Sequence, residues 1–167
     1  MLGEYNDIMN KELLEKITVF LSIQKNKLGA VSTVNADGGP ESALVYFTFD
    51  NDLNFYFATR DNSRKYQNLI QNPKVAFVMG QDNPPQTLQL EGIASVIRDV
   101  EGQKHLFPEL VGLASAKNFS APISQMSTGG LQFVKIAPTW LRLGNFEVRK
   151  HEDTFQEIKK ESSDENK

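Results

Sequence analysis

Residues Leu28–Phe49 have the sequence LGAVSTVNADGGPESALVYFTF, in which two apolar runs flank a short polar segment. The second run, Glu41–Phe49, alternates with a period of two, so its side chains separate onto two faces. The polar segment, Asn35–Pro40, contains two glycines and a proline and is typical of a tight turn. Because parallel neighbours need a long crossover, two strands joined by so short a turn must be antiparallel. We therefore expect a β-hairpin at this point of the chain.

The same alternation continues along most of the chain. Further strands are expected at Leu53–Ala58, Lys74–Gly80, Thr87–Arg98, Leu131–Ala137 and Thr139–Phe146. The Lys74–Gly80 strand is almost continuously apolar, which is typical of a strand covered on both faces. The alternation of Thr87–Arg98 slips at Gly92, which predicts a β-bulge or a bend of the barrel. Six or seven such strands predict a mainly β protein, and closure into a barrel would leave few free strand edges.

Three helices are expected beside the strands. The opening segment carries an apolar stripe with helical spacing, typical of a helix that covers a sheet. The stripe consists of Met9, Leu13, Ile17 and Phe20. A short helix is expected from Ser63 to Gln71. It should end before Pro73, because the residue before a proline avoids the α region. The third segment, Asp99–Leu113, is weakly helical and is interrupted by Pro108.

The chain of 167 residues is expected to form one domain, residues 1–149, followed by a polar tail. The tail, residues 150–167, is expected to be disordered apart from a nascent helix near Phe155–Lys160. Residues 151–167 carry the whole net charge of −3. The balanced body lacks the basic block of a nucleic-acid-binding protein, and no such partner is expected. The polar connection Ser115–Gly130 is longer than compact domains usually carry without a function.

The composition narrows the kinds of site that the chain can hold. The absence of cysteine excludes disulfides, thiolate nucleophiles and zinc–thiolate centres. Only two histidines, His105 and His151, are present, so we expect neither a metal site nor a Ser-His-Asp triad. The usual glycine-rich phosphate loops do not occur. No apolar run approaches the roughly 20 residues of a membrane-spanning helix, and no signal peptide is visible, so we expect a cytoplasmic protein.

One segment has an unusual charge pattern. Residues Thr59–Lys65, TRDNSRK, join an aromatic strand to the short helix. Arg64 and Lys65 fall in the first helical turn, where cations oppose the helix dipole and proteins usually place acids. These cations fit a bound phosphate, because the helix start offers free N–H groups and Ser63 adds a hydroxyl. The alternative is a solvated basic surface paired with Asp61, and the pattern alone leaves both interpretations open.

Several short segments, taken in order, form a wider pattern. They are Leu28–Pro40, Leu44–Phe47, Leu53–Thr59, Ser63–Lys65, Asn72–Ala76 and Leu90–Gly92. This succession resembles the pyridoxamine 5′-phosphate oxidase-like family, in register from Leu28 to Ile97 and more loosely over Leu131–Phe146. The resemblance implies a six-stranded antiparallel split β-barrel with flanking helices that binds FMN. It also implies a homodimer with each flavin at the subunit interface.

The resemblance further implies which residues bind the phosphate of the cofactor. Ser63, Arg64 and Lys65 match the family segment that holds the FMN 5′-phosphate. Ala58 and Thr59 match the preceding strand end, which lies beside the phosphate.

Other matching positions are expected beside the flavin ring. The strand whose backbone would follow the ring contains Ala43, Leu44, Val45 and Tyr46. Gln89 sits where the family often offers a side-chain amide, although it also fits an outward-facing strand residue. Trp140 and Arg142 of the partner chain are further candidates, because residues two apart share one strand face. The alternative for this pair is a core or interface tryptophan beside a solvated arginine.

These expectations leave more than one function open. The first is an FMN-dependent oxidoreductase of unknown substrate, in which the flavin supplies the redox chemistry. The second is a non-catalytic flavin- or haem-binding module that stores or senses its ligand. A dimeric structural protein without flavin requires Ser63–Lys65 to be a plain solvated turn. Vitamin B6 synthesis is not expected, because Leu141–Phe146 lacks the histidine of the B6 enzymes, and the chain resembles smaller, general-stress-type relatives.

Overall fold

The computed structural model describes residues 2–24, 27–114, 130–147 and 154–159 of the 167-residue chain. The alternation of apolar and polar side chains makes most of the elements strands. In chain order the elements are α1 (Leu2–Ser22), β1 (Leu28–Val34), β2 (Pro40–Phe49), β3 (Phe55–Arg60), α2 (Arg64–Gln71), β4 (Lys74–Gln81), β5 (Gln86–Ile97), α3 (Val100–Ala114), β6 (Leu131–Asn145) and β7 (Phe155–Lys159). None of the described helices is both long and apolar enough to cross a membrane.

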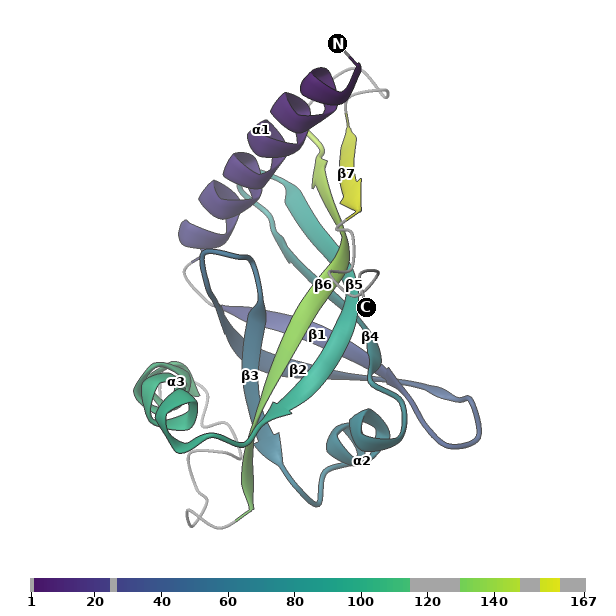
Figure 1. Cartoon of the computed structure of the whole chain (residues 1–167), viewed down its shortest axis with the longest axis vertical. Coiled ribbons are helices and arrows are strands. Elements are labelled where there is room, and N and C mark those ends of the chain that lie inside the picture. The colour runs from purple at the N-terminus through teal and green to yellow at the C-terminus, as the bar shows by residue number, and fades with distance from the viewer. Residues whose placement is uncertain (1, 25–26, 115–129, 148–153, 160–167) are drawn as a thin grey trace.

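The strands form a closed antiparallel barrel (Figure 1). The hydrogen-bonded order is β3-β2-β1-β4-β5-β6, and the ring closes because β3 also pairs with β6. In this closing pair Phe55 lies opposite Ile136 and Arg60 lies opposite Leu131. Strand β7 lies outside the ring and pairs antiparallel with β6. The expected fold, a mainly β six-stranded barrel with flanking helices, is confirmed.

Aromatic side chains fill the inside of the barrel. The rings of Phe47, Phe55 and Phe77 are buried, and their centroids lie 5.3 to 5.6 Å apart. Helix α1 adds the buried Ile17 and Phe20 to the same core and runs beside β7 (Figure 1). Helix α3 packs against β2 and β3, and its Leu106 and Leu110 form a second, smaller apolar cluster with Phe133 of β6. The first helix therefore covers the sheet, as its apolar stripe predicted.

The predicted turn and the predicted bulge are both confirmed. The hairpin between β1 and β2 brings Val34 opposite Pro40, and Gly38 in its turn has a φ of 81°. The pairing of β5 with β6 shifts register between Glu91 and Gly92. A Cβ atom on Gly92 would lie 2.6 Å from the carbonyl oxygen of Ala137, so the close approach of β6 requires a glycine here.

Strand β4 differs from its prediction. It was expected to be covered on both faces, but its side chains alternate between buried and exposed positions. Val75, Phe77 and Met79 point into the core, whereas Val78 is 40% exposed. Leu44 on β2 is 69% exposed. The apolar sequence of β4 therefore reflects an outer face that the single chain leaves open.

The C-terminal part of the chain also differs from its prediction. The two expected strands are one continuous strand, β6, in which Pro138 lies opposite the bulge at Gly92. Helix α3 continues through Pro108 instead of ending there. Phe155–Lys159, expected as a nascent helix in a disordered tail, forms β7. This strand covers the edge of β6 that β3 leaves free, and the rest of the expected tail lies outside the described residues.

Candidate functional site

Polar side chains gather where β3 ends and α2 begins. The hydroxyl oxygens of Thr59 and Ser63 lie 2.9 Å apart. The Ser63 hydroxyl accepts a hydrogen bond of 3.3 Å from the Tyr66 N–H, so Ser63 is the N-cap of α2. The Lys65 ammonium donates to the Thr59 hydroxyl at 3.4 Å. Because the first turn of α2 contains no acidic residue, the helix dipole and Lys65 together make this corner electropositive.

Lys65 has no carboxylate partner within the described residues. Its side chain is half-buried, and burial lowers the pKa of its ammonium group. A partly desolvated cation without a counter-ion costs free energy, and an anion beside it would remove that cost. Lys65 could therefore hold an anionic group at this corner.

Arg64 is in a different situation, because it forms an ion pair with Glu41 of β2. Its Nε lies 3.0 and 3.1 Å from the two carboxylate oxygens, and its Nη2 donates to Oε1 as well. This hydrogen bonding lowers the pKa of Glu41 and raises that of Arg64. Asp61, the partner considered from the sequence, instead accepts a hydrogen bond at its backbone oxygen from the Gln67 side chain.

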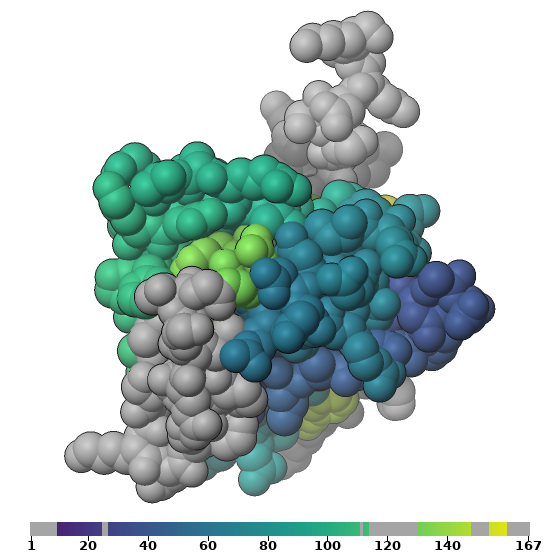
Figure 2. Space-filling view, turned by 90° about the horizontal axis from the view of Figure 1, so that it is seen from below, coloured from purple at the N-terminus to yellow at the C-terminus, as the bar shows by residue number. Residues whose placement is uncertain are grey.

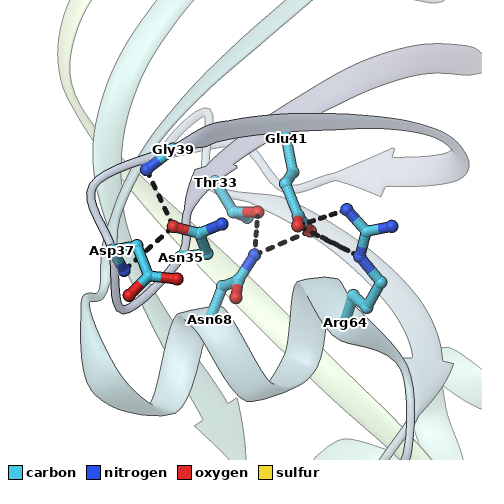
Figure 3. A network of polar contacts seen from close by, with 7 residues as sticks. All are labelled: Thr33, Asn35, Asp37, Gly39, Glu41, Arg64 and Asn68. Atoms are coloured by element: carbon cyan, nitrogen blue, oxygen red, sulfur yellow. Dashed lines mark hydrogen bonds and ion pairs between the residues drawn. The ribbon is translucent and has the colours of Figure 1, made fainter.

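The Glu41 carboxylate is held from below by a buried amide (Figure 3). The Asn68 side-chain nitrogen donates to Glu41 at 3.1 Å and to the Thr33 hydroxyl at 3.0 Å. Asn68 and Thr33 are both buried, at 7% and 2% exposure. On the same side of the molecule, the Asn35 side chain accepts hydrogen bonds from the N–H groups of Asp37 and Gly39 and so fixes the hairpin turn.

A cavity of about 340 Å³ opens next to this network. Its lining residues are Thr33, Pro40, Glu41, Ser42, Ala43, Arg64 and Lys65. Helix α2 packs on β1 and β2, and the β1–β2 hairpin lies beside it on the face seen in Figure 2. The first turn of α2, which carries Arg64 and Lys65, forms one wall of the cavity, and strand β2 forms a neighbouring wall.

The structure divides the strand residues predicted for the site between several places. Ala43 lines the cavity, and Thr59 contacts Lys65. Val45 is buried in the barrel core, whereas Leu44 and Tyr46 alternate with it and point to the outer face. Ala58 packs against the apolar cluster under α3, on the opposite face from Thr59. Of residues 43–46, Ala43 alone lines the cavity.

The other predicted residues form a second cluster on β5 and β6. Arg142 donates to the Gln89 side-chain oxygen from Nε at 3.1 Å and from Nη2 at 2.6 Å. Its guanidinium carbon lies 5.3 Å from the Trp140 ring centroid and 4.8 Å from that of Phe155 on β7. We name this group of four residues the Arg142 cluster. It combines a fixed cation with two aromatic rings.

The Arg142 cluster lies far from the cavity and on the outer face of the sheet, whereas Glu41 and Ala43 at the cavity lie on the face of the buried Val45. Leu44, Ala30, Val78, Gln89 and Arg142 lie opposite one another on five successive strands. Four spacings between neighbouring strands amount to about 19 Å along the sheet in this direction. In the other direction around the closed ring, Thr59 lies opposite Gln132, and Arg142 lies ten residues further along β6, about 33 Å along the strand. A ligand on Lys65 of one chain is therefore remote from Arg142 of the same chain.

Sequence reasoning missed Glu41, Thr33, Asn68 and Phe155. A signal existed for Glu41, because it shares a strand face with Ala43 and the buried Val45, and a carboxylate on such a face needs a partner. Asn68 lies one helical turn after Arg64, which also placed both on one helix face. Phe155 gave no signal, because its role depends on the pairing of β7 with β6.

The described residues offer binding groups and no evident acid–base machinery. No group of three or more His, Cys, Asp or Glu within them is placed to hold a metal ion. The titratable residues that line the cavity are Glu41, Arg64 and Lys65. The site is suited to holding an anionic group and a neighbouring apolar group. The polar connection at residues 115–129, expected to have a function, lies outside the described residues.

A family model described as pyridoxamine 5′-phosphate oxidase matches residues 13–143 of the chain. No curated protein sequence matches the chain. Among solved structures, General Stress Protein 26 from Bacillus anthracis str. Sterne is 25% identical with a TM-score of 0.60, over 78% of this chain and 92% of that one.

Two further solved structures show the same fold at lower identity. A pyridoxamine 5′-phosphate oxidase-related, FMN binding protein from Nostoc punctiforme PCC 73102 is 13% identical with a TM-score of 0.59, over 89% of this chain and 96% of that one. A protein named F420 reductase is 20% identical with a TM-score of 0.57, over 72% of this chain and 94% of that one.

Proposed function

The chain belongs to the pyridoxamine 5′-phosphate oxidase family, and we propose that it binds FMN and acts as an oxidoreductase on an unidentified substrate. One observation carries this proposal: Lys65 is a half-buried cation with no carboxylate partner in the described part of the chain. Beside it stand the Thr59 and Ser63 hydroxyls and the free N–H groups at the start of α2. These are the donors that suit a phosphate monoester.

The relatives support a flavin as the bearer of that phosphate. The Nostoc protein is described as FMN binding, and another solved relative carries the name F420 reductase. FMN is the ligand that we propose, and the deazaflavin F420 is the competing ligand that a titration must include. Both carry a phosphate group, which would meet Lys65, and a flat ring, which would lie on the neighbouring strand.

We place the flavin ring against β2, next to the phosphate subsite. Ala43 lines the cavity, and Leu44 follows it on the exposed outer face. Exposed apolar side chains continue across that face with Val78 on β4 and Ile93 on β5. A second copy of the chain would cover them and would bring its own Arg142 cluster to the ring. The proposal therefore includes a homodimer with the flavin at its interface.

The division of labour between cofactor and chain follows from the site. When bound, FMN supplies hydride or electron transfer, so the protein needs only to bind, orient and tune it. Lys65, Ser63 and Thr59 would hold the phosphate, and the backbone of residues 43–46 would support the ring. Binding without turnover, as in a flavin- or haem-binding sensor, is the second candidate. It is favoured by one observation: Glu41 and Arg64 at the cavity are already paired with each other.

The binding proposal is tested by titrating the full chain with FMN and with riboflavin, which lacks the phosphate. We expect FMN to bind more tightly, and Lys65→Ala to reduce this preference by about tenfold to a hundredfold, the value of a charged hydrogen bond. Lys104→Ala is the matched control, because Lys104 is an exposed lysine of α3 paired with Glu101. Equal affinity of the unmodified protein for FMN and riboflavin would contradict phosphate binding.

Turnover is tested separately on the FMN-loaded protein under anaerobic conditions. Bleaching of the flavin absorbance on addition of NADH or NADPH would support the oxidoreductase. Stable oxidised flavin with both donors, together with tight FMN binding, would favour the binding module. Addition of haem or F420 to the apoprotein, followed by its visible spectrum, checks the two competing ligands.

A further inference from the structure

Arg64 uses only part of its hydrogen-bonding capacity. Its Nε and Nη2 donate to Glu41, and its Nη1 has no hydrogen bond within the described residues. A guanidinium is planar, so pairing along one edge leaves a second edge open. Arg64 and Lys65 both line the cavity. Arg64 is therefore paired with a carboxylate along one edge and open along the other. Lys65 beside it has no carboxylate partner within the described residues.

The surroundings of Glu41 decide whether Arg64 can leave it. The Glu41 side chain is 19% exposed, whereas that of Arg64 is 81% exposed. If Arg64 turned away to meet a ligand, the carboxylate would lose two donors in a largely covered position. Leaving a covered charge without its partner is costly, so the ion pair is expected to persist when a ligand binds.

The carboxylate is also anchored to the barrel. Asn68 joins it to the Thr33 hydroxyl of β1 through hydrogen bonds of 3.1 and 3.0 Å (Figure 3). Thr33 and Asn68 are among the few buried polar residues of the described chain. A continuous series of contacts therefore runs from the rigid barrel to an exposed guanidinium at the rim of the cavity.

We propose that Glu41 is a positioning residue for phosphate binding. Its carboxylate, held by Asn68, fixes the Arg64 guanidinium at the rim of the cavity and leaves one edge of it for the phosphate that Lys65 binds. This inference rests on the proposed function, because it assumes a phosphate at Lys65. The opposing model is competition, in which Glu41 occupies Arg64 until the ligand displaces it. The two models predict opposite effects of removing the carboxylate.

The experiment compares FMN and riboflavin binding to the full chain by quenching of flavin fluorescence. Glu41→Gln keeps the side-chain size and removes the charge. We expect the preference for FMN over riboflavin to fall about tenfold, with riboflavin affinity unchanged. Removal of a negative charge would by itself strengthen phosphate binding. A preference that rises or stays the same would therefore overturn the positioning role.

Two further variants keep the test decisive. Arg64→Lys retains the charge, but a lysine cannot pair with Glu41 through two nitrogens, so this variant should also lower the FMN preference. It tests the inference even if Glu41→Gln fails to fold. Glu101→Gln, which breaks the surface pair with Lys104 on α3, is the control and should change nothing. If Lys65→Ala abolishes the FMN preference and neither the Glu41 nor the Arg64 variant lowers it, only this inference fails. If the unmodified protein shows no FMN preference, the proposed function fails with it.

Discussion

The side-chain oxygen of Gln89 accepts two hydrogen bonds from Arg142, 3.1 Å from Nε and 2.6 Å from Nη2. Because a guanidinium can only donate, Gln89 must turn its oxygen towards Arg142, which leaves its NH₂ group for another acceptor. The same guanidinium lies over the ring of Trp140 and over the ring of Phe155. The Arg142 cluster is thus a fixed platform on the outer face, ten residues along β6 from the position opposite Thr59.

This separation predicts that mixed dimers recover flavin binding. A Lys65→Ala chain and an Arg142→Leu chain should each bind FMN weakly, because each lacks one half of every interface site. In a mixed dimer one site lacks both residues and the other has both intact, since the two sites are related by two-fold symmetry. After random exchange of subunits, about a quarter of all sites should bind FMN tightly.

The recovered stoichiometry is measured by titration of the exchanged mixture with FMN. The unmixed variants at the same concentration are the controls. No recovery after verified subunit exchange would mean that Lys65 and Arg142 do not act on one flavin across an interface.

A second prediction concerns the open outer face. Leu44 is 69% exposed on β2, and a charge placed there should weaken a dimer that buries it. We expect Leu44→Glu to sediment as a monomer and to bind FMN less tightly. Val100→Glu on α3 is the control, because Val100 is 62% exposed on an element outside that face. A Leu44→Glu protein with the same mass in solution as the unmodified chain would argue against this interface.

The sequence predicted those features of the fold that depend on local patterns. The turn at Asn35–Pro40 and the bulge at Gly92 are encoded by a few neighbouring residues, and both are confirmed. Strand β7 was missed because it exists only through a free edge of β6, which is a long-range property. Helix α3 passes Pro108, since packing outweighs the local preference to end a helix there.

The candidate site was accessible to sequence reasoning only in part. The cationic start of α2 could be recognised, because it departs from the usual charge preference of helices. The partner of Arg64 could not, because Glu41 is distant in sequence and becomes its neighbour only when α2 packs on β2. Thr33 could not be predicted for the same reason, because it lies on β1, far from Asn68 in the sequence, and accepts its hydrogen bond only in the folded chain.

A third prediction concerns pH. Burial acts to raise the pKa of Asp50, but hydrogen bonds from Tyr56 at 2.6 Å and Asn54 at 2.8 Å outweigh it, and the pKa lies below its ordinary value of 3.8. A carboxyl group whose pKa is lower when folded stabilises the fold above its unfolded pKa and stops doing so as pH falls through the folded value. The free energy of unfolding should therefore decrease below about pH 4.

Urea unfolding between neutral pH and pH 3 measures this contribution. Asp50→Asn should lower the free energy of unfolding at neutral pH by about 1–2 kcal/mol and should flatten its decline in acid. Tyr56→Phe, which removes one donor, should act in the same direction. Identical acid dependence in the Asp50 variant and the unmodified chain would show that other carboxylates dominate.

The last prediction concerns the bulge that sets the register of β6. A Cβ atom on Gly92 would lie 2.6 Å from the Ala137 carbonyl oxygen and 2.9 Å from a methyl group of Ile136. Since backbone cannot yield as a flexible side chain does, Gly92→Ala should lower the free energy of unfolding by about 1–3 kcal/mol. Gly112→Ala is the matched control, because nothing lies within 4 Å of its Cβ position and α3 should gain about 0.5–1 kcal/mol.

The two glycine variants are compared by urea unfolding and by FMN titration. Gly92 of β5 lies where the pairing with β6 shifts register. The part of β6 that carries Trp140 and Arg142 begins next to this shift. A displaced bulge would move the Arg142 cluster along the outer face, so flavin affinity should fall with stability in Gly92→Ala and stay constant in Gly112→Ala. Equal stability of the Gly92 variant and the unmodified chain would mean that β6 can shift at this point, and that the bulge does not fix the position of Arg142.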